Sequence, residues 1–284
     1  MKASPVGDPR VALVTGGTSG IGRALAEALA AAGVTVGIVA RDARRGEEAR
    51  SSIAAASGNE RVELFTGDLS DLSSVHRLAA TLAEAHRAIN VLVHCAAVYT
   101  RHRAVTADGL ETMFATNLAG PFLLTNLILD QLRAGPARIL VLSAPSTVRL
   151  DFDDLQAERR FRSLTAFGAS KAADLLFTFE LARRLEGSGV TANAIHPGLV
   201  RTKLMRDAPA PLRWATRLVS RSPARAAESI VPVALAPEHE GRTGRFYKAG
   251  REIEAPSYTR DPEVAGRLWD VTASLTQLSQ GATS

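Results

Sequence analysis

Short runs of β-branched and other apolar residues alternate with longer segments of helical periodicity along the chain. The runs that we expect to form strands cover residues 11–15, 34–40, 61–66, 89–95, 137–143, 190–196 and 245–248. The early runs are almost continuously apolar, which is typical of strands buried on both faces of a parallel sheet. Strands that alternate with helices indicate crossover connections. The pattern therefore predicts an α/β fold, with a doubly wound, seven-stranded parallel sheet and helices on both faces.

The segments between the predicted strands carry apolar residues on one helical face. Ile21, Leu25 and Leu29 recur at a spacing of four residues, as expected for a helix that packs against a sheet. A second stripe of this kind follows Asp71, and we expect Ser70 to be the N-cap of that helix.

The chain has 284 residues and shows neither an internal repeat nor a low-complexity linker. This length suits one large domain, so we expect residues 1–284 to form a single domain. Prolines interrupt the helical pattern in the segment 203–240. We expect this segment to cover a substrate site, and loop rigidity is the alternative explanation for its prolines.

Composition narrows the class of protein. Apolar residues make up 46% of the chain and charged residues 22%, which is typical of a globular protein with a large core. The single cysteine, Cys95, excludes an intrachain disulfide framework and a cysteine zinc cluster, so we predict no metal site. A lone cysteine also fits a reducing compartment, and we find no secretion signal and no run of roughly 18 apolar residues that would span a bilayer. The expected location is the cytoplasm, without a membrane partner.

The formal net charge of +5 would suit a nucleic-acid surface. The arginines, however, lie among acidic residues and are not interleaved with aromatic residues. This arrangement is typical of an ordinary solvated surface, so we predict no nucleic-acid partner.

A glycine-rich segment follows the first predicted strand and opens the first predicted helix. Its sequence is Thr15-Gly16-Gly17-Thr18-Ser19-Gly20-Ile21-Gly22. Glycines suit this position because a pyrophosphate must approach bare backbone N–H groups, and the helix dipole favours negative charge there. The place between strand and helix indicates a dinucleotide site. We expect its cofactor contacts to come from Thr15, Gly16, Thr18, Ser19, Gly20, Ile21 and Gly22.

The spacing Thr-Gly-x-x-x-Gly-x-Gly resembles the signature of the short-chain dehydrogenase/reductase family, which has a single-domain Rossmann fold. Later segments are also similar to the family, namely Asp68-Leu69, Thr116-Asn117-Leu118-Ala119-Gly120, Ser170-Lys171, and Pro197-Gly198 followed by Thr202. Three segments resemble the retinol-dehydrogenase-like branch in particular: Ala40-Arg41-Asp42, the stretch Ile195-His196-Pro197-Gly198-Leu199-Val200-Arg201-Thr202, and the tail Arg267-Leu268-Trp269-Asp270-Val271. The resemblance covers almost the whole chain.

Arg41 stands at the end of the second predicted strand. An acidic residue there would bind the adenosine ribose and repel a 2′-phosphate, whereas a guanidinium can bind that phosphate with two hydrogen bonds. Arg41 therefore predicts NADP(H) as the cofactor, and a surface role beside Arg44 and Arg45 is the alternative. The resemblance implies further cofactor contacts from Asp68, Leu69, Ala96, Lys171, Pro197, Gly198, Val200 and Thr202. It implies that Asp68 contacts the adenine amine, and a loop cap is the alternative role of this residue. For Thr202 the alternative is a helix N-cap.

The loop after the fourth predicted strand departs from the family. Where the family has Asn-Ala-Gly, this chain has Cys95-Ala96-Ala97. The family's glycine makes room for the adenosine ribose, so we expect the methyl group of Ala97 to weaken cofactor binding without preventing it.

The residues at the catalytic positions implied by the resemblance differ even more from the family pattern. In the family a tyrosine donates a proton to the substrate carbonyl, and a lysine four residues later holds the cofactor ribose. Here Lys171 is present, but the tyrosine is replaced by Phe167, which has no proton to give. The serine that orients the substrate is usually the second of a pair, and the pair here is Ser143-Ala144. A shift in register would let Ser143 or Ser146 take this role.

Asn117 keeps the family's position, where the resemblance implies support for a helix irregularity and for a water in the proton relay. Two groups of candidate replacement acids or bases remain. His94 ends a strand, and we interpret it as structural. Asp151, Asp153 and Asp154 precede the helix that carries Lys171, and a solvated loop is their alternative role.

Loss of the donor and the orienting serine should slow ordinary ketone reduction by several orders of magnitude, because each supplies roughly a hundredfold or more. Three functions remain. The one we favour is hydride transfer from NADP(H) to an activated C=N or C=C bond. The second is a non-redox cyclase, isomerase or dehydratase that uses the same scaffold for positioning. The third is a cofactor-binding protein without catalysis.

Apolar residues in the expected pocket segments, among them Phe152, Phe161 and Trp214, indicate a small apolar organic substrate, and burial in the core is the alternative. Family members often pair through two neighbouring helices. The apolar stretches 122–124 and 127–129 could form such an interface or belong to the core, and we predict a homodimer.

Overall fold

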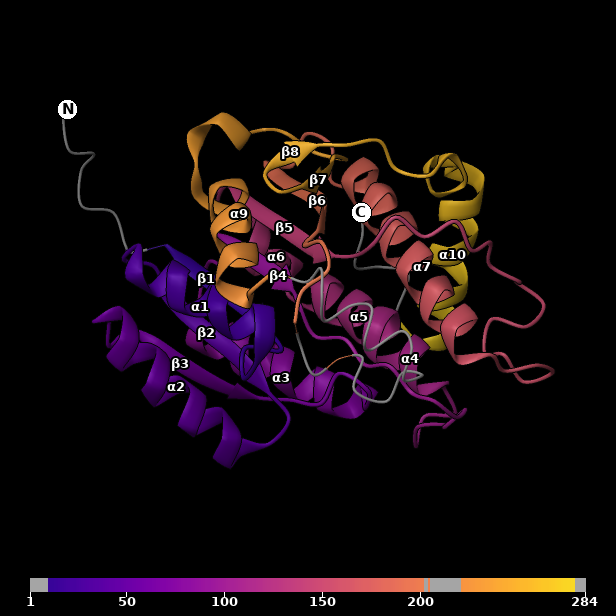
Figure 1. Ribbon diagram of the computed structural model, residues 1–284, viewed down its shortest axis with the longest axis horizontal. Coiled ribbons are helices and arrows are strands. Elements are labelled where there is room, and N and C mark those ends of the chain that lie inside the picture. The colour runs from indigo at the N-terminus through magenta and orange to yellow at the C-terminus, as the bar shows by residue number, and fades with distance from the viewer. Residues whose placement is uncertain (1–9, 202–203, 205–220, 279–284) are drawn as a thin grey trace.

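The computed structural model describes residues 10–201, 204 and 221–278. Within them, one sheet has eight strands in the order β3-β2-β1-β4-β5-β6-β7-β8 (Figure 1). The seven parallel strands are β1 (Val11–Thr15), β2 (Thr35–Ala40), β3 (Val62–Thr66), β4 (Val91–His94), β5 (Ala137–Leu142), β6 (Val190–His196) and β7 (Phe246–Lys248). The predicted α/β Rossmann fold is confirmed, and each of these strands ends within two residues of its predicted bounds.

The eighth strand corrects the predicted count of seven. Strand β8 (Arg251–Glu252) pairs antiparallel with β7, and both of its residues are exposed. It forms because the chain reverses at Ala249 and Gly250, which have positive φ angles of 51° and 76°. A polar, two-residue edge strand has no hydrophobic alternation, which is the signal that predicts strands from sequence.

Helices cover both faces of the sheet (Figure 1). On one face lie α1 (Gly20–Ala31), α2 (Ala43–Ser57) and α9 (Pro223–Leu235). On the other lie α3 (Leu72–Ala85), α5 (Gly120–Leu127), α7 (Ser163–Arg184) and α10 (Pro262–Leu275). The shorter helices are α4 (Thr112–Phe114), the π-helix η1 (Ala115–Ala119), α6 (Leu129–Arg133), η2 (Pro237–His239) and η3 (Ser257–Arg260). No helix in the described part of the chain is both long enough and apolar enough to cross a bilayer.

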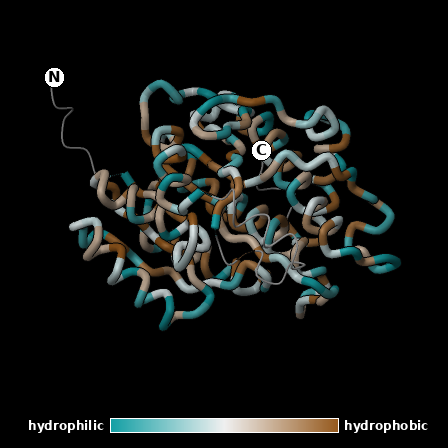
Figure 2. The backbone as a smooth tube through the Cα atoms, viewed as in Figure 1, coloured by the Kyte–Doolittle hydropathy of each residue, from teal (hydrophilic) through white to brown (hydrophobic). Residues whose placement is uncertain are grey.

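Strand β1 shows how the two cores arise from one sheet. Leu13 packs in the core under α3, α5, α7 and α10, whereas its neighbours Ala12 and Val14 pack in the core under α1, α2 and α9. Successive strand residues point to opposite faces, so an all-apolar strand supplies both cores. Hydrophilic segments lie mainly along the outer edge of the molecule (Figure 2).

The N-cap of α3 differs from the prediction. The side chain of Asp71, not of Ser70, accepts the hydrogen bond from the backbone N–H of Ser74, at 3.0 Å. The Ser70 hydroxyl instead donates to Asp68. Both residue types are good N-caps, so sequence preference alone could not separate two neighbours.

The stretch 122–124, which could have formed an interface or the core, belongs to the core of this chain. Phe122, Leu123 and Leu124 are each at most 1% exposed. The indole of Trp269 on α10 packs edge-on against Phe122, with ring centroids 4.7 Å apart, and stacks on Phe177. Helix α10 therefore covers the apolar face that α5 and α7 share.

Candidate functional site

The turn between β1 and α1 requires glycine at two positions. Gly16 has a φ of +70°, and a Cβ there would lie 2.9 Å from Cα of Ala96. A Cβ on Gly22 would lie 2.5 Å from the carbonyl oxygen of Gly16. Any side chain would push the turn apart. Glycine thus lets the first turn of α1 approach the ends of β1 and β4 closely.

The first turn of α1 is left without a side-chain cap. Ser19 is its N-cap residue but makes no capping hydrogen bond. By contrast, the carboxylates of Asp42 and Asp71 cap α2 and α3. The free N–H groups of α1, at the positive end of its dipole, are therefore available to an anion.

A cavity of about 300 Å³ lies over the carboxyl ends of β1, β2, β3 and β4. Predicted cofactor residues that line it are Gly16, Thr18, Ser19, Gly20, Ile21, Gly22, Arg41, Asp68, Leu69 and Ala96. We refer to it as the cofactor cleft. Ligands of open α/β sheets bind at this edge, where the strand order reverses between β1 and β4.

Several residues that were not among the predicted cofactor contacts also line the cofactor cleft. They include Arg45, Ala97, Val98, Thr116 and Leu204. Arg45 lies in the first turn of α2, just after Arg41 and the N-cap residue Asp42, so its nearness to Arg41 in the sequence could have identified it as a second cation. The methyl group of Ala97 belongs to the lining, as expected for a residue in place of the family's glycine.

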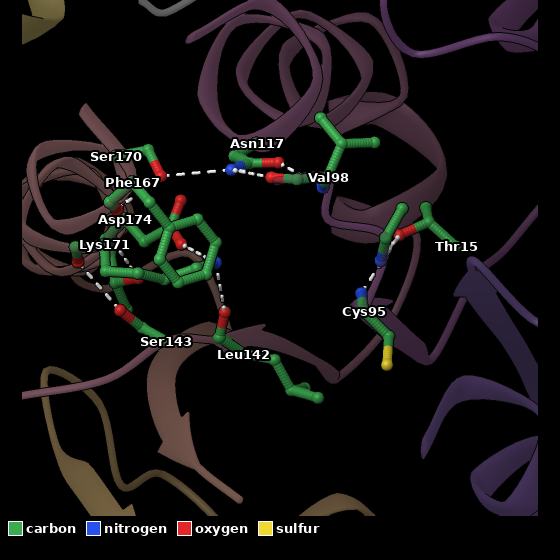
Figure 3. A network of polar contacts seen from close by, with 12 residues as sticks. Thr15, Cys95, Val98, Asn117, Leu142, Ser143, Phe167, Ser170, Lys171 and Asp174 are labelled. Atoms are coloured by element: carbon green, nitrogen blue, oxygen red, sulfur yellow. Dashed lines mark hydrogen bonds and ion pairs between the residues drawn. The ribbon is translucent and has the colours of Figure 1, made fainter. Parts of the chain in front are cut away.

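Thr15 supports the cleft from below instead of lining it. Its hydroxyl is buried and accepts hydrogen bonds from the backbone N–H groups of Cys95, at 3.0 Å, and Ala96, at 3.1 Å (Figure 3). These bonds tie the end of β1 to the loop after β4. Thr15 therefore positions the two sides of the cleft relative to each other.

Asp68 shows the contact that we gave as the alternative to adenine binding. Its carboxylate accepts hydrogen bonds from the backbone N–H and the hydroxyl of Ser70, at 2.9 and 2.7 Å. Both bonds are made by Oδ1, while the residue also lines the cofactor cleft. The loop cap and a contact with a bound adenine are therefore compatible.

The segment after β6 carries the remaining predicted cofactor residues. Pro197, Gly198 and Val200 lie at the carboxyl end of the sheet, with Gly198 at a φ of +79°, but they are not part of the cleft lining. Thr202 lies outside the described residues. We expected the segment 203–240 to cover a substrate site, and within it Leu204 lines the cleft. Residues 203 and 205–220 lie outside the described residues. The later residues of the segment include helices α9 and η2.

Asn117 ties three elements together from within a π-helix. Its Oδ1 accepts from the backbone N–H of Val98 at 2.8 Å, and its Nδ2 donates to the carbonyl of Val98 and to Oγ of Ser170 (Figure 3). The helix irregularity implied by the resemblance is present as η1, and such π-helical turns are frequent at functional sites. Asn117 thereby fixes the loop after β4 against α7.

Phe167 and Lys171 lie one turn apart on α7 (Figure 3). The Lys171 ammonium is 5.7 Å from the centre of the Phe167 ring. It donates to the Leu142 carbonyl at 3.3 Å and forms an ion pair with Oδ2 of Asp174 at 2.7 Å. The sequence interpretation missed Asp174, although the spacing of three residues on one helix is a sufficient signal.

Burial is the main influence on Asp174, which is 2% exposed. It raises the pKa of this carboxyl to about 6, against the opposing effect of the Lys171 ammonium. The second oxygen, Oδ1, is buried without a hydrogen-bond partner, so the carboxylate form lacks part of the solvation it had in water.

The hydroxyl of Ser143 is already engaged. It is buried and donates to the backbone carbonyl of Lys171 at 2.8 Å (Figure 3). This bond holds the end of β5 to α7 and gives Ser143 a positioning role. Its neighbour Ala144 has no polar side-chain atom to orient a substrate.

The candidate replacement acids and bases have structural contacts. Nε2 of His94 lies 2.7 Å from the Thr125 hydroxyl, and burial lowers the His94 pKa to about 3, so this ring is neutral. The Asp154 carboxylate accepts hydrogen bonds from the backbone N–H groups of Glu158 and Arg159. His94 thus joins the end of β4 to α5, and Asp154 stabilises its own loop.

The residues of the cofactor cleft fit a dinucleotide phosphate. The glycine turn and the uncapped α1 would hold the pyrophosphate, and Arg41 with Arg45 presents two exposed guanidinium groups on the same cavity. When bound, such a cofactor supplies a hydride or accepts one. The chain contributes the binding surface and the buried polar network on α7.

Comparisons with known proteins agree with this geometry. The family model described as short chain dehydrogenase matches residues 10–212. Retinol dehydrogenase 12 of Mus musculus is 37% identical over 273 residues, which cover 94% of this chain and 86% of that protein.

Solved structures show the same fold. The crystal structure of an uncharacterized protein from Mycobacterium Paratuberculosis has a TM-score of 0.72 and 32% identity, over 94% of this chain and 93% of that one. A short chain dehydrogenase from Burkholderia cenocepacia J2315, solved in complex with NADP, has a TM-score of 0.67 and 26% identity, over 86% and 98%. The chain therefore belongs to the short-chain dehydrogenase/reductase family of oxidoreductases and resembles its retinol-dehydrogenase-like branch.

Proposed function

We propose that this protein binds NADP(H) and transfers hydride to an activated C=N or C=C bond of a small, apolar organic substrate. Support for the cofactor comes from the uncapped N-terminus of α1 and from the two arginines on the cleft. The Burkholderia cenocepacia relative was solved with NADP, and no acidic residue takes the place of Arg41 at the end of β2.

The single observation that carries the reaction is the position of Phe167. Its ring lies where the family has a phenol, with Lys171 one turn further along α7. A ring without a hydroxyl cannot protonate a carbonyl oxygen, and Ser143 donates to Lys171 instead of to a substrate. A substrate that is not left as an alkoxide after hydride transfer needs less help from a general acid. An iminium ion becomes a neutral amine, and an unsaturated ketone that takes hydride at its β-carbon becomes a delocalised enolate.

The residues of the chain then have separable roles. The glycine turn, Arg41 and Arg45 bind and orient the cofactor. Lys171 does not line the cleft and is paired with Asp174, and it would hold the cofactor ribose. Asn117 holds the loop after β4 against α7, so that both sides of the substrate region keep their positions. Apolar side chains near Phe167, among them Phe161 and Leu204, exclude water and favour an apolar molecule.

The decisive experiment follows NADPH oxidation by the purified protein with three matched acceptors: a saturated ketone, the corresponding α,β-unsaturated ketone and a cyclic imine. We expect oxidation with the unsaturated ketone or the imine and little with the saturated ketone. Ready reduction of the saturated ketone would contradict the proposal. A change of substrate without NADPH oxidation would instead support the non-redox alternative, and binding without any product would support a cofactor-binding protein.

The cytoplasmic location and the homodimer stay predictions. Because Phe122, Leu123 and Leu124 are buried within one chain, a dimer would have to use other side chains. Light scattering of the purified protein would give its oligomeric state, and a monomer would remove the prediction.

A further inference from the structure

A second aromatic side chain meets Phe167 in the substrate region. Tyr99, in the loop after β4, is 5% exposed. Its ring lies edge-on to that of Phe167, with centroids 5.7 Å apart and planes at 77°. The other two tyrosines lie on different elements, Tyr247 in β7 and Tyr258 in η3. Among the described residues, Tyr99 is therefore the tyrosine whose ring contacts Phe167, which stands in place of the family's phenol.

The Tyr99 ring belongs to a small apolar cluster that adjoins the cofactor cleft. The cluster also contains Val98, Met113, Phe161, Ala166, Phe167 and Leu204. Val98 and Leu204 line the cofactor cleft as well, so the cluster and the cleft share part of one wall. A substrate placed between the cofactor and Phe167 would lie against this wall.

The position of Tyr99 is held firmly. Both backbone polar groups of the preceding residue, Val98, are hydrogen-bonded to the Asn117 amide. The Tyr99 hydroxyl donates to Oγ of Ser163 at 2.9 Å. The phenol is thus anchored at its backbone by η1 and at its hydroxyl by the first residue of α7.

We propose that Tyr99 is the proton donor of this site, in place of the absent phenol on α7. The inference rests on the proposed hydride transfer. When an unsaturated ketone takes a hydride at its β-carbon, the C=C electron pair moves toward the carbonyl and leaves an enolate. The O–H bond of Tyr99 breaks, and its proton goes to the enolate. The overall reaction then adds one hydride from NADPH and one proton from the protein.

Ser163 completes the proton path. Its hydroxyl already accepts the hydrogen bond from Tyr99, and the residue is half-buried, so it contacts solvent as well. After the transfer, the phenolate oxygen takes a proton from the Ser163 hydroxyl, which regains one from water. The negative charge of the phenolate lies at the N-terminal end of the long helix α7, where the dipole is favourable.

Tyr99→Phe tests the donor while it keeps the ring contact with Phe167. We expect NADPH oxidation with the best acceptor to fall by about a hundredfold or more, with NADPH affinity unchanged. The matched control is Tyr258→Phe, which also removes a hydrogen-bonded hydroxyl, the one that accepts from the Leu150 N–H, and should leave the rate unchanged. Ser163→Ala should give a smaller loss. An unchanged rate in Tyr99→Phe would overturn the proposal.

A second measurement does not depend on turnover. A phenol that contacts a bound ligand changes its near-ultraviolet absorbance, so NADP⁺ and the saturated ketone product are added together at constant pH. We expect a tyrosine difference spectrum in the parent protein and in Tyr258→Phe, but not in Tyr99→Phe. The same difference spectrum in Tyr99→Phe would overturn the role of Tyr99. If no acceptor oxidises NADPH but Tyr99 passes this test, the hydride proposal fails and the acid–base assignment stands.

Discussion

The ammonium of Lys171 and the carboxylate of Asp174 form a buried ion pair, with Nζ and Oδ2 2.7 Å apart. The same ammonium lies 5.7 Å from the centre of the Phe167 ring. Because Phe167 has no hydroxyl to share with the lysine, Asp174 provides the only carboxylate paired with it among the described residues. The ammonium of Lys171 is thus held within α7, by a carboxylate three residues further along the helix.

Asp174 makes stability depend on pH. Burial raises its pKa to about 6 from the ordinary 3.8, so between these values the folded chain holds a proton that the unfolded chain has lost. The free energy of unfolding should therefore fall as pH rises from about 4 to about 6, by about 3 kcal/mol from this group. Asp174→Asn removes that slope. Urea unfolding of both proteins across this range measures it, and identical slopes would show that Asp174 does not titrate there.

Phe167→Tyr alone should not restore robust ketone reduction. The variant regains a donor, but Ala144 still offers no hydrogen bond to the substrate, and the Ser143 hydroxyl remains on the Lys171 carbonyl. The double variant Ala144→Ser with Phe167→Tyr should exceed the single variant by about a hundredfold. NADPH oxidation with a saturated ketone gives both rates. Full activity in the single variant would mean that the second position is not limiting.

Gly16→Ala should impair both stability and cofactor binding. A methyl group there meets Cα of Ala96 at 2.9 Å, in addition to the strain of a positive φ, and we expect a loss of about 3 kcal/mol. Gly33→Ala is the matched control, because Gly33 has a φ of +82° with nothing within 4 Å, so only strain of about 1 kcal/mol applies. Urea denaturation compares the stabilities of the two variants, and NADPH titration compares their affinities for the cofactor. Equal losses would rule out the contact with Ala96 as the cause.

Arg41 and Arg45 should select NADPH over NADH. Each guanidinium lines the cofactor cleft, and loss of a charge-assisted hydrogen bond weakens binding by about tenfold or more. Arg41→Ala and Arg45→Ala should therefore reduce NADPH affinity and leave NADH affinity unchanged. Arg44→Ala is the control, since Arg44 pairs with Glu48 and its side chain is 82% exposed. Calorimetry with both cofactors decides this, and equal effects on both would refute a 2′-phosphate contact.

Local patterns made much of the fold and of the cofactor cleft predictable. The glycine turn lies within eight consecutive residues, and its strand and helix follow from periodicity over short windows. The pairing of Asp174 with Lys171 could also have been predicted from the sequence, because Asp174 lies three residues after Lys171 on one helix. Strand β8 could not have been predicted, since a two-residue polar strand forms only where β7 is present to pair with it.

Residue types and local patterns were enough to establish the order of strands and helices, the glycine turn at the phosphate site, and the absence of a hydroxyl at Phe167. These features depend on residue type and on near neighbours along the chain. The packing of the folded chain was needed to show that the Ser143 hydroxyl donates to the Lys171 carbonyl, that α10 covers α5 and α7, and that the Tyr99 ring contacts Phe167. Such contacts join residues far apart in the chain, 64 positions for Tyr99 and Ser163, and they depend on how the helices pack on the sheet, which no local pattern encodes.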